Sequence, residues 1–337
     1  MCYSCRLQPE ASPLPAWKIP KETLMKRRLA WWRCRSEARA LAVVAFGVFV
    51  VLCVPSRAAE PDWGGVAGPT EAPPRAIGGY ALGCLDGGMA LALDGPGYQV
   101  MRPSRARFFG HPDLIQFVRW LGNTALVQGR FGILVGDVAQ PRGGPMRSGH
   151  ASHQSGLDVD IWFLPAPTRL LSATDRETLS AVTMVAPDGL TVGQEWTDGH
   201  LDLLRAAASY PRVDRIFVNA AIKQKLCESA GFNRTWLTKI RPWWGHDHHF
   251  HVRLACPESD KNCSPQAPPP PGEGCKGELA WWFSKEARQM LLENKLAPRK
   301  AITMADLPVQ CEAAYHRSPM RSAAKGGNDT SKNAAVP

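Results

Sequence analysis

The sequence of 337 residues lacks the motifs of several common hydrolase mechanisms. It has no G-x-S-x-G, which argues against a serine hydrolase with its nucleophile on a strand-to-helix elbow. The one S-x-x-K, at residues 322–325, falls in a low-complexity tail where no pocket can form, which disfavours a penicillin-type serine mechanism. There is also no H-E-x-x-H, so the usual glutamate general base of zinc proteases is absent. Any hydrolytic chemistry must therefore use other residues.

The chain carries little net positive charge once the first 59 residues are set aside. The whole chain has a formal net charge of +10, but ten of its Lys and Arg residues precede Glu60, against three acidic residues. The remainder holds 30 basic and 27 acidic residues, which gives no electrostatic argument for a nucleic-acid partner. With 45% hydrophobic residues, the chain is expected to be globular.

The apolar run at residues 40–54 is too short for a confident membrane span, because it holds only 15 residues. A basic segment that begins near Met25 precedes it, and Ser56 and Ala58 suit a small-residue cleavage site. We interpret residues 1–59 as a signal peptide whose true start is Met25, which predicts export and no stable membrane span after cleavage. An uncleaved anchor helix is the alternative.

Cysteine usage agrees with export. Four of the ten cysteines lie in the predicted signal peptide, and the remaining six are an even number for an oxidising compartment. Three disulfides are the natural prediction, but the residues alone favour only Cys256–Cys263, which would close a short polar loop. A four-cysteine zinc site is disfavoured because no C-x2-C pair remains after residue 59. The six cysteines are Cys84, Cys227, Cys256, Cys263, Cys275 and Cys311.

Three segments follow the predicted signal peptide. Residues 60–77 are rich in Pro and Gly and predict a flexible leader, residues 78–312 are expected to form a single catalytic domain, and residues 313–337 a disordered tail. Strands mix irregularly with helices and several are hairpin-linked, which predicts an α+β fold with a central antiparallel sheet and flanking helices. Helices are expected from Pro112, around 173–186 and 198–209, and over 220–229 and 285–296; strands are expected within 90–100 and at 133–135, 157–162 and 215–218.

A first cluster of polar residues, at 148–160, predicts chemistry. His150 and His153 are three residues apart and precede a strictly alternating strand. Because side chains alternate along a strand, Asp158 and Asp160 share one face. We expect Asp158 to accept hydrogen bonds rather than to bind a metal.

A second cluster, at residues 246–251, holds four more histidines. In an extended strand, His249 and His251 share a face, while Phe250 turns toward the core. Including the one at position 200, seven of the nine histidines of the chain lie in or near the two clusters. His248 is expected to be mostly incidental. Hydrogen-bonded structural histidines are the alternative interpretation.

Two imidazoles and one carboxylate suit a catalytic zinc ion, which takes three protein ligands and leaves a fourth position for water. His153, Asp160 and His251 are the predicted set. Zinc lowers the pKa of its water to about 7, so a spare histidine could accept the proton. A closed structural zinc site is the alternative.

The Trp pairs at 243–244 and 281–282 could line a substrate cleft, but packing in the core is the preferred interpretation.

Several motifs, in colinear order over residues 81–311, resemble the penicillin-insensitive murein endopeptidases. These belong to the metallopeptidase group that contains lysostaphin, D-Ala-D-Ala peptidases and the hedgehog signalling domain. The string S-G-H-A-S-H-Q-x-G-L-D-V-D is the most specific of them. The matching segments are 98–103, 109–112, 148–160, 215–219, 241–243 and 249–254.

The resemblance implies a periplasmic zinc endopeptidase that cleaves the D-alanyl–meso-diaminopimelyl cross-bridges of peptidoglycan. It implies that His153, Asp160 and His251 bind the metal and that His150 is associated with the same site. His246 and His249 would act as general base and transition-state stabiliser, and the resemblance does not decide which residue has which role.

The resemblance also implies the disulfides Cys84–Cys311, Cys227–Cys275 and Cys256–Cys263. Asp188 matches a ligand of a second, weaker metal position, but Thr191 stands where a histidine is expected. The rival functions are a D,D-carboxypeptidase or dipeptidase on stem peptides, a non-catalytic zinc-binding or wall-binding protein, and a metal-dependent nuclease. The oligomeric state is not predicted.

Overall fold

The computed structural model describes residues 61–129, 132–296 and 301–320. These residues belong to one compact unit, residues 57–337. The predicted signal peptide lies outside the described residues. Within the described part of the chain, no helix combines the length and the apolar character needed to cross a bilayer.

A seven-stranded sheet, in the order β10-β9-β11-β8-β7-β5-β4, forms the centre of the domain. The inner pairs β9–β11, β11–β8 and β8–β7 are antiparallel, whereas β10–β9 and β5–β7 are parallel. The strands of these two parallel pairs are separated in sequence by a helix, and the edge pair β4–β5 is again antiparallel. The strands are β4 (Asp94–Gly95), β5 (Tyr98–Val100), β7 (Ile133–Val135), β8 (Asp158–Trp162), β9 (Val213–Val218), β10 (Ile240–Pro242) and β11 (His249–Leu254).

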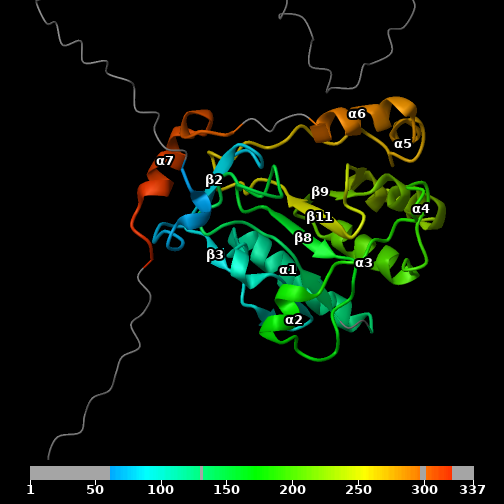
Figure 1. Cartoon of the computed structure of the whole chain (residues 1–337), viewed down its shortest axis with the longest axis horizontal. Coiled ribbons are helices and arrows are strands. Elements are labelled where there is room, and N and C mark those ends of the chain that lie inside the picture. Colours follow the sequence, from blue (N-terminus) through cyan, green and yellow to red (C-terminus); the bar gives the residue numbers. More distant parts are fainter. Residues whose placement is uncertain (1–60, 130–131, 297–300, 321–337) are drawn as a thin grey trace, which may run out of the picture. The chain divides into compact units, whose positions relative to one another are not determined.

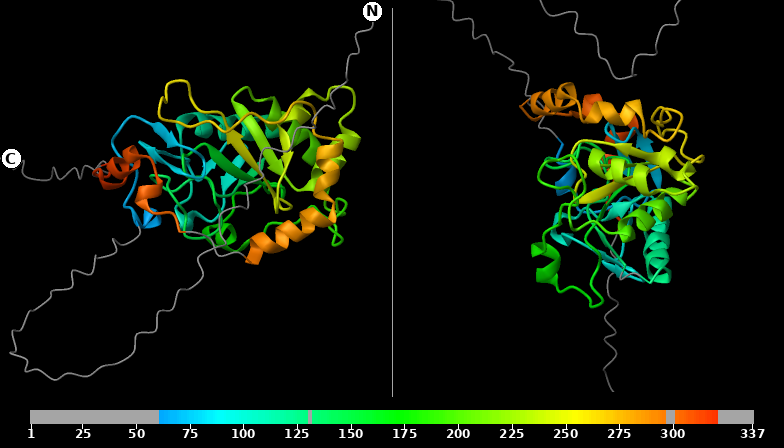
Figure 2. Two further views of the ribbon diagram at one scale, coloured as in Figure 1. Left: turned by 90° about the horizontal axis from the view of Figure 1, so that it is seen from above. Right: turned by 90° about the vertical axis from the view of Figure 1, so that its right-hand side faces the viewer.

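Helices flank this sheet, and the predicted α+β fold is confirmed. Helices α1 and α3 pack on it, α4 contacts β10 and α5, and α7 contacts β2. The α5–α6 pair and α7 lie at opposite ends of the domain (Figures 1 and 2). The helices are α1 (Pro112–Val127), α2 (Ala173–Thr178), α3 (Asp198–Ser209), α4 (Ala220–Ser229), α5 (Gly277–Trp282), α6 (Lys285–Leu296) and α7 (Val309–His316). Short ladders join β1 (Arg75–Gly78) to β2 (Gly83–Asp86) and β3 (Met89–Ala90) to β6 (Phe109–Gly110).

Alternation along β8 and β11 divides the sheet into an apolar and a polar face. Val159 and Ile161 of β8 and Phe250 and Val252 of β11 are fully buried in the main core, together with the apolar side chains of α1 and α3. The intervening residues of both strands therefore point to the other face. This leaves the aspartates of β8 and the histidines of β11 together, opposite the core.

The helix expected around 173–186 is shorter than predicted, since α2 ends at Thr178. Ser172 and Asp175 cap its start. The following segment pairs instead with the turn before β11, where Met184 N donates to Asp247 O at 2.7 Å. Tertiary pairing therefore overrides the local helical pattern.

Residues 61–77, the described part of the expected leader, pack against the rest of the domain. Trp63 is 1% exposed and its ring contacts Tyr315 at a centroid distance of 5.0 Å. The tail expected from residue 313 is also ordered at its start, because α7 continues to residue 316 and Arg142 donates to its last carbonyls. The two segments stabilise each other, a long-range contact that composition does not reveal. Residues 321–337 lie outside the described residues.

All three disulfides implied by the resemblance are present. Cys84–Cys311 ties α7 to β2, Cys227–Cys275 ties α4 to the segment before α5, and Cys256–Cys263 closes a loop after β11. The first spans a sequence separation of 227 residues and the last a separation of 7.

The Cys84→Ala/Cys311→Ala double variant should lower the free energy of unfolding more than Cys256→Ala/Cys263→Ala. The entropy of loop closure gives about 5 kcal/mol for the long loop and about 2.5 kcal/mol for the short one. Urea denaturation of both variants and the parent measures the two losses. Equal losses, or a larger loss for the short loop, would contradict the prediction.

Candidate metal centre

The candidate centre is built first by the register of β8 and β11, which lie side by side in the sheet (Figure 1). In this antiparallel pair, His251 stands directly opposite Asp160, and Arg253 stands opposite Asp158. Directly opposed residues on one face have Cβ atoms about 5 Å apart, so their side chains meet. The polar face thus brings together two clusters that are distant in sequence, with His153 and His251 separated by 98 residues.

A strained loop supplies the third side chain of the centre. His153 has a left-handed backbone with φ 67° and is completely buried. Its backbone N donates to Asp158 Oδ2 at 3.0 Å, which holds the loop against β8. Its imidazole Nδ1 lies 2.7 Å from Val138 O. A carbonyl oxygen can only accept, so Nδ1 carries the hydrogen and Nε2 is left with its lone pair.

Three donor atoms then converge on one point. His153 Nε2, Asp160 Oδ1 and His251 Nδ1 are separated by 3.1, 3.2 and 3.4 Å. Asp160 Oδ1 is buried and has no hydrogen-bond partner among the described residues. Ligands in a tetrahedral zinc site, at about 2.0–2.1 Å from the ion, lie about 3.3 Å from one another. The spacing and the chemistry of these donors therefore fit a zinc ion.

His150 joins this group from the same loop as His153. Ligand atoms of His150, His153 and Asp160 all lie within 4.8 Å of one another, which makes these three residues a possible metal-binding set. His150 Nδ1 lies 3.5 Å from Asp160 Oδ2, and its Nε2 lies 3.0 Å from Asp137 Oδ2. The histidine thus connects the centre to a further carboxylate.

Asp158 orients His251 from behind. Its Oδ1 lies 3.1 Å from His251 Nε2, and it accepts two hydrogen bonds from Arg253, at 2.8 and 3.1 Å. The Arg253 guanidinium lies over the rings of Tyr80 and Phe217. A carboxylate behind Nε2 keeps the hydrogen on that nitrogen and directs the Nδ1 lone pair toward Asp160.

The electrostatics of the centre favour a positive charge among these donors. Burial would lower the pKa of His251, but the Asp158 carboxylate outweighs it and raises the pKa to about 8. Burial would raise the pKa of Asp160, yet the neighbouring His249 and His153 hold it well below its usual range. An ionised carboxylate among imidazoles is complementary to a cation.

Two further histidines of the second cluster border the centre. The ring centroids of His246 and His249 are 5.0 Å apart, and His249 Nε2 lies 3.7 Å from Asp160 Oδ2. Burial lowers the pKa of both, and the pKa of His246 falls to about 3. Both imidazoles are therefore neutral near pH 7, and the low pKa makes His246 the weaker proton acceptor of the two. His248 is exposed, and its Nδ1 lies 3.0 Å from His249 Nδ1.

Asp188 is not among the side chains that gather here. It is exposed, and its Oδ1 accepts from Leu190 N at 2.9 Å within a turn. In residues 61–129, 132–296 and 301–320, no second group of three metal-binding side chains includes it. The other site residues expected from the sequence, at positions 150, 153, 160, 246, 249 and 251, form one cluster.

Asp137 is a residue of this cluster that the sequence interpretation missed. It is buried and lies two residues after β7, in a loop rich in Gly and Pro. Burial would raise its pKa, but hydrogen bonds from His150 and Arg107 outweigh this effect and lower the pKa to about 2. An acidic residue just beyond a buried strand was the available signal, and it marks a candidate residue without identifying its neighbours.

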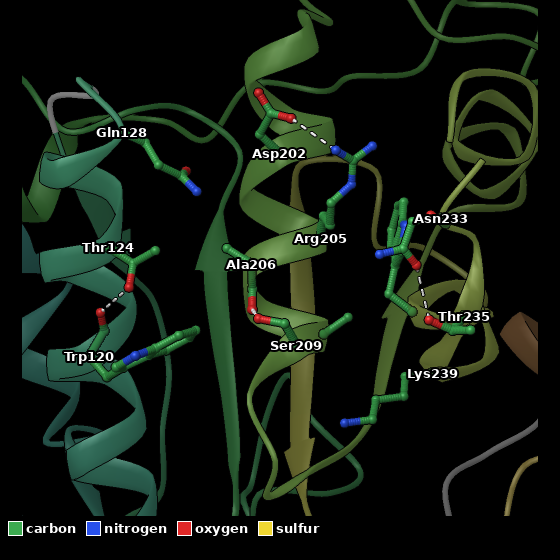
Figure 3. Close-up of a pocket in the computed structure, with 12 residues that line it drawn as sticks. Trp120, Thr124, Gln128, Asp202, Arg205, Ala206, Ser209, Asn233, Thr235 and Lys239 are labelled. Atoms are coloured by element: carbon green, nitrogen blue, oxygen red, sulfur yellow. Dashed lines mark hydrogen bonds and ion pairs between the residues drawn. The ribbon is translucent and has the colours of Figure 1, made fainter. Parts of the chain in front are cut away.

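A pocket of about 280 Å³ opens beside His150, Asp160 and His249. A larger hollow of about 830 Å³ lies elsewhere, between α1, α3 and the segment 233–239 (Figure 3). No histidine lines the larger hollow, and its Asp202 contacts Arg205 at 3.8 Å. The smaller pocket is therefore the candidate active site, because it alone of the two adjoins the convergent donors.

Residues 76–316 match the family model described as penicillin-insensitive murein endopeptidase. A protein of that name from Yersinia enterocolitica is 42% identical over 268 residues, which cover 79% of this chain and 94% of the relative. One from Klebsiella pneumoniae is 47% identical over 259 residues, covering 77% and 92%. One from Haemophilus influenzae is 47% identical over 212 residues, covering 61% and 72%. The family match includes β8, β11 and the loop of His153.

Arg253→Met should lower the free energy of unfolding by about 3–5 kcal/mol, because it leaves the buried Asp158 carboxylate without its cation. Denaturant unfolding at neutral pH measures the loss. Arg169→Met is the matched control, since the Arg169–Asp175 pair is solvent-exposed and its removal should leave stability nearly unchanged. Similar stabilities for the two variants would refute the structural role of Arg253.

Proposed function

We propose, from the fact that the chain belongs to the penicillin-insensitive murein endopeptidase family, that it is a periplasmic zinc endopeptidase of peptidoglycan. Its substrate would be the D-alanyl–meso-diaminopimelyl cross-bridge between stem peptides. The observation that carries the proposal is the convergence of His153 Nε2, Asp160 Oδ1 and His251 Nδ1 at 3.1–3.4 Å, beside a pocket. Three disulfides are consistent with an exported protein.

His153, Asp160 and His251 would hold the zinc, with His150 beside it. When bound, zinc would supply a Lewis acid for the scissile carbonyl and an activated water. The protein's own contribution is to keep three donors fixed before binding. Val138 O and Asp158 set the imidazole tautomers, and the rigid strands set the spacing.

His249 is the better candidate for the general base. It is neutral near pH 7, and its Nε2 lies 3.7 Å from Asp160 Oδ2, a carboxylate that would stabilise the imidazolium formed by proton transfer. His246 Nδ1 lies 2.8 Å from Trp244 O, which places the hydrogen on Nδ1. We assign His249 to accepting the proton and passing it to the leaving amine. The neutral His246 keeps a lone pair on Nε2, so it would stabilise negative charge on the substrate only after taking up a proton.

Metal content and hydrolysis should be lost together when a ligand is removed. The parent protein should contain about one zinc ion and cleave purified cross-linked muropeptide dimers, whereas chelator treatment or His153→Ala should abolish both properties. Metal analysis and product chromatography on the same samples measure them. His316→Ala, which changes an exposed histidine outside the cluster, should keep both.

Three results would contradict this function. Full cleavage by a metal-free sample would remove the metal mechanism. Cleavage of pentapeptide monomers but not of dimers would indicate a D,D-carboxypeptidase. Bound zinc without cleavage of either substrate would indicate a non-catalytic binding protein.

His249→Ala should keep its zinc but lose about 10²–10⁴-fold in kcat, the usual contribution of one general base. His316→Ala is the control, because His316 is exposed and lies outside the cluster and the pocket lining; it should keep its kcat. Steady-state hydrolysis of dimers, with zinc content measured for each variant, tests the assignment. An unchanged kcat in a zinc-loaded His249→Ala protein would refute the assignment of His249 as the general base.

A further inference from the structure

A short basic loop borders the candidate active site and has no part in the steps above. Arg102 and Arg105 line the pocket of about 280 Å³ together with Trp162, facing a lining that includes His150, Asp160 and His249. We propose that Arg102 and Arg105 bind a free carboxylate of the substrate, the one on the carbon atom that carries the scissile amide nitrogen. This inference rests on the proposed function and names the chemical feature by which that site selects its substrate.

Arg105 is available to a ligand. Its side chain is 49% exposed, and the only acceptor of its guanidinium among the described residues is Asp137, whose two carboxylate oxygens lie 3.3 and 3.5 Å from Nη1. The Asp137 carboxylate also accepts from Arg107 at 2.9 Å and contacts His150 at 3.0 Å. One negative charge is thus shared by two guanidinium groups and an imidazole. At this edge three guanidinium groups, those of Arg102, Arg105 and Arg107, face the two carboxylates of Asp137 and Glu177, so one positive charge remains to attract an anion.

Arg102 adds a second guanidinium to the same lining. One of its nitrogens donates to Leu179 O at 3.0 Å, and its guanidinium carbon lies 5.9 Å from the centroid of the Trp162 ring. These two contacts position the group while leaving other N–H donors for a ligand. A planar guanidinium presents paired donors that match the two oxygens of a carboxylate.

The loop is held in an unusual conformation by α2. Arg102 and Ala106, on either side of the turn at Pro103–Arg105, both have left-handed backbones, with φ 54° and 50°. Glu177 of α2 accepts from both the backbone N and the hydroxyl of Ser104, each at 2.8 Å. Non-glycine residues keep such conformations only where surrounding contacts impose them, which is typical of binding sites. The structure therefore builds this arginine pair into a fixed place.

The position of the pair fits the proposed substrate. The amide nitrogen of the cross-bridge is attached to a carbon atom that also bears a free carboxylate, so this anion must enter the same pocket as the scissile bond. Arg105 is connected to the centre through Asp137, His150 and Asp160. A substrate whose carboxylate is converted to an amide would leave two cations without their partner, and the site should reject it.

The test compares two purified muropeptide dimers that differ only in this carboxylate, which is free in one and a carboxamide in the other. The zinc-loaded parent should cleave the carboxamide dimer with a kcat/KM about 10- to 100-fold lower, the usual worth of hydrogen bonds to a charged group. Arg105→Gln should lose a similar factor on the carboxylate dimer, mainly through KM, and little on the carboxamide dimer. Arg105→Lys should recover part of the loss, and Arg102→Gln should behave like Arg105→Gln.

Arg119→Gln is the matched control, because Arg119 is an exposed arginine on α1 and does not line the pocket. It should cleave both dimers as the parent does. Equal kcat/KM of the parent for the two dimers would overturn the inference and leave the proposed function intact. An equal loss on both dimers in Arg105→Gln would also overturn it, since that result indicates a structural role. If the parent cleaves neither dimer, the proposed function fails and the inference fails with it.

Discussion

The register between β8 and β11 is the constraint on which the candidate centre depends. His251 lies opposite Asp160 only in this register, and the same pairing places Arg253 opposite Asp158. A slip by one residue would turn these side chains into the core and Phe250 and Val252 out to the polar face. The apolar side chains between the strand and α1 therefore define the geometry of the polar donors. Core packing and site assembly are one requirement in this fold.

Burying Asp158 carries a large free-energy cost, because its carboxylate is fully removed from water. A buried ion pair gains little net stability over an apolar pair of similar volume, since both charges lose their hydration. Asp158 contacts Arg253, the backbone of His153 and His251 Nε2. It therefore connects the strand, the loop and the neighbouring strand, and orients the His251 imidazole. Its value lies in that geometry rather than in stability.

The sequence predicted those parts that local periodicity controls. Alternation places His249 and His251 on one face and separates them from Phe250, and Asp158 and Asp160 follow the same rule. The left-handed backbone of His153, the short α2 and the packing of Trp63 on Tyr315 were not predictable, because contacts distant in sequence determine them. The sequence did not identify Asp137 and Arg105 as site residues, for the same reason. They lie in loops whose path is set by the sheet, so no spacing in the sequence marks them as neighbours of His150.

The two sides of the pocket have different supports. The donors of the candidate metal centre stand largely on paired strands of the central sheet, whereas Arg102 and Arg105 stand on a turn held by the six-residue helix α2. Loops tolerate change more readily than central strands do. In the proposed scheme, substitutions in the turn and α2 could therefore alter which amide bond is selected while β8 and β11 keep the hydrolytic geometry. Asp137 limits this independence, because it contacts both Arg105 and His150 and so couples substrate charge to the centre.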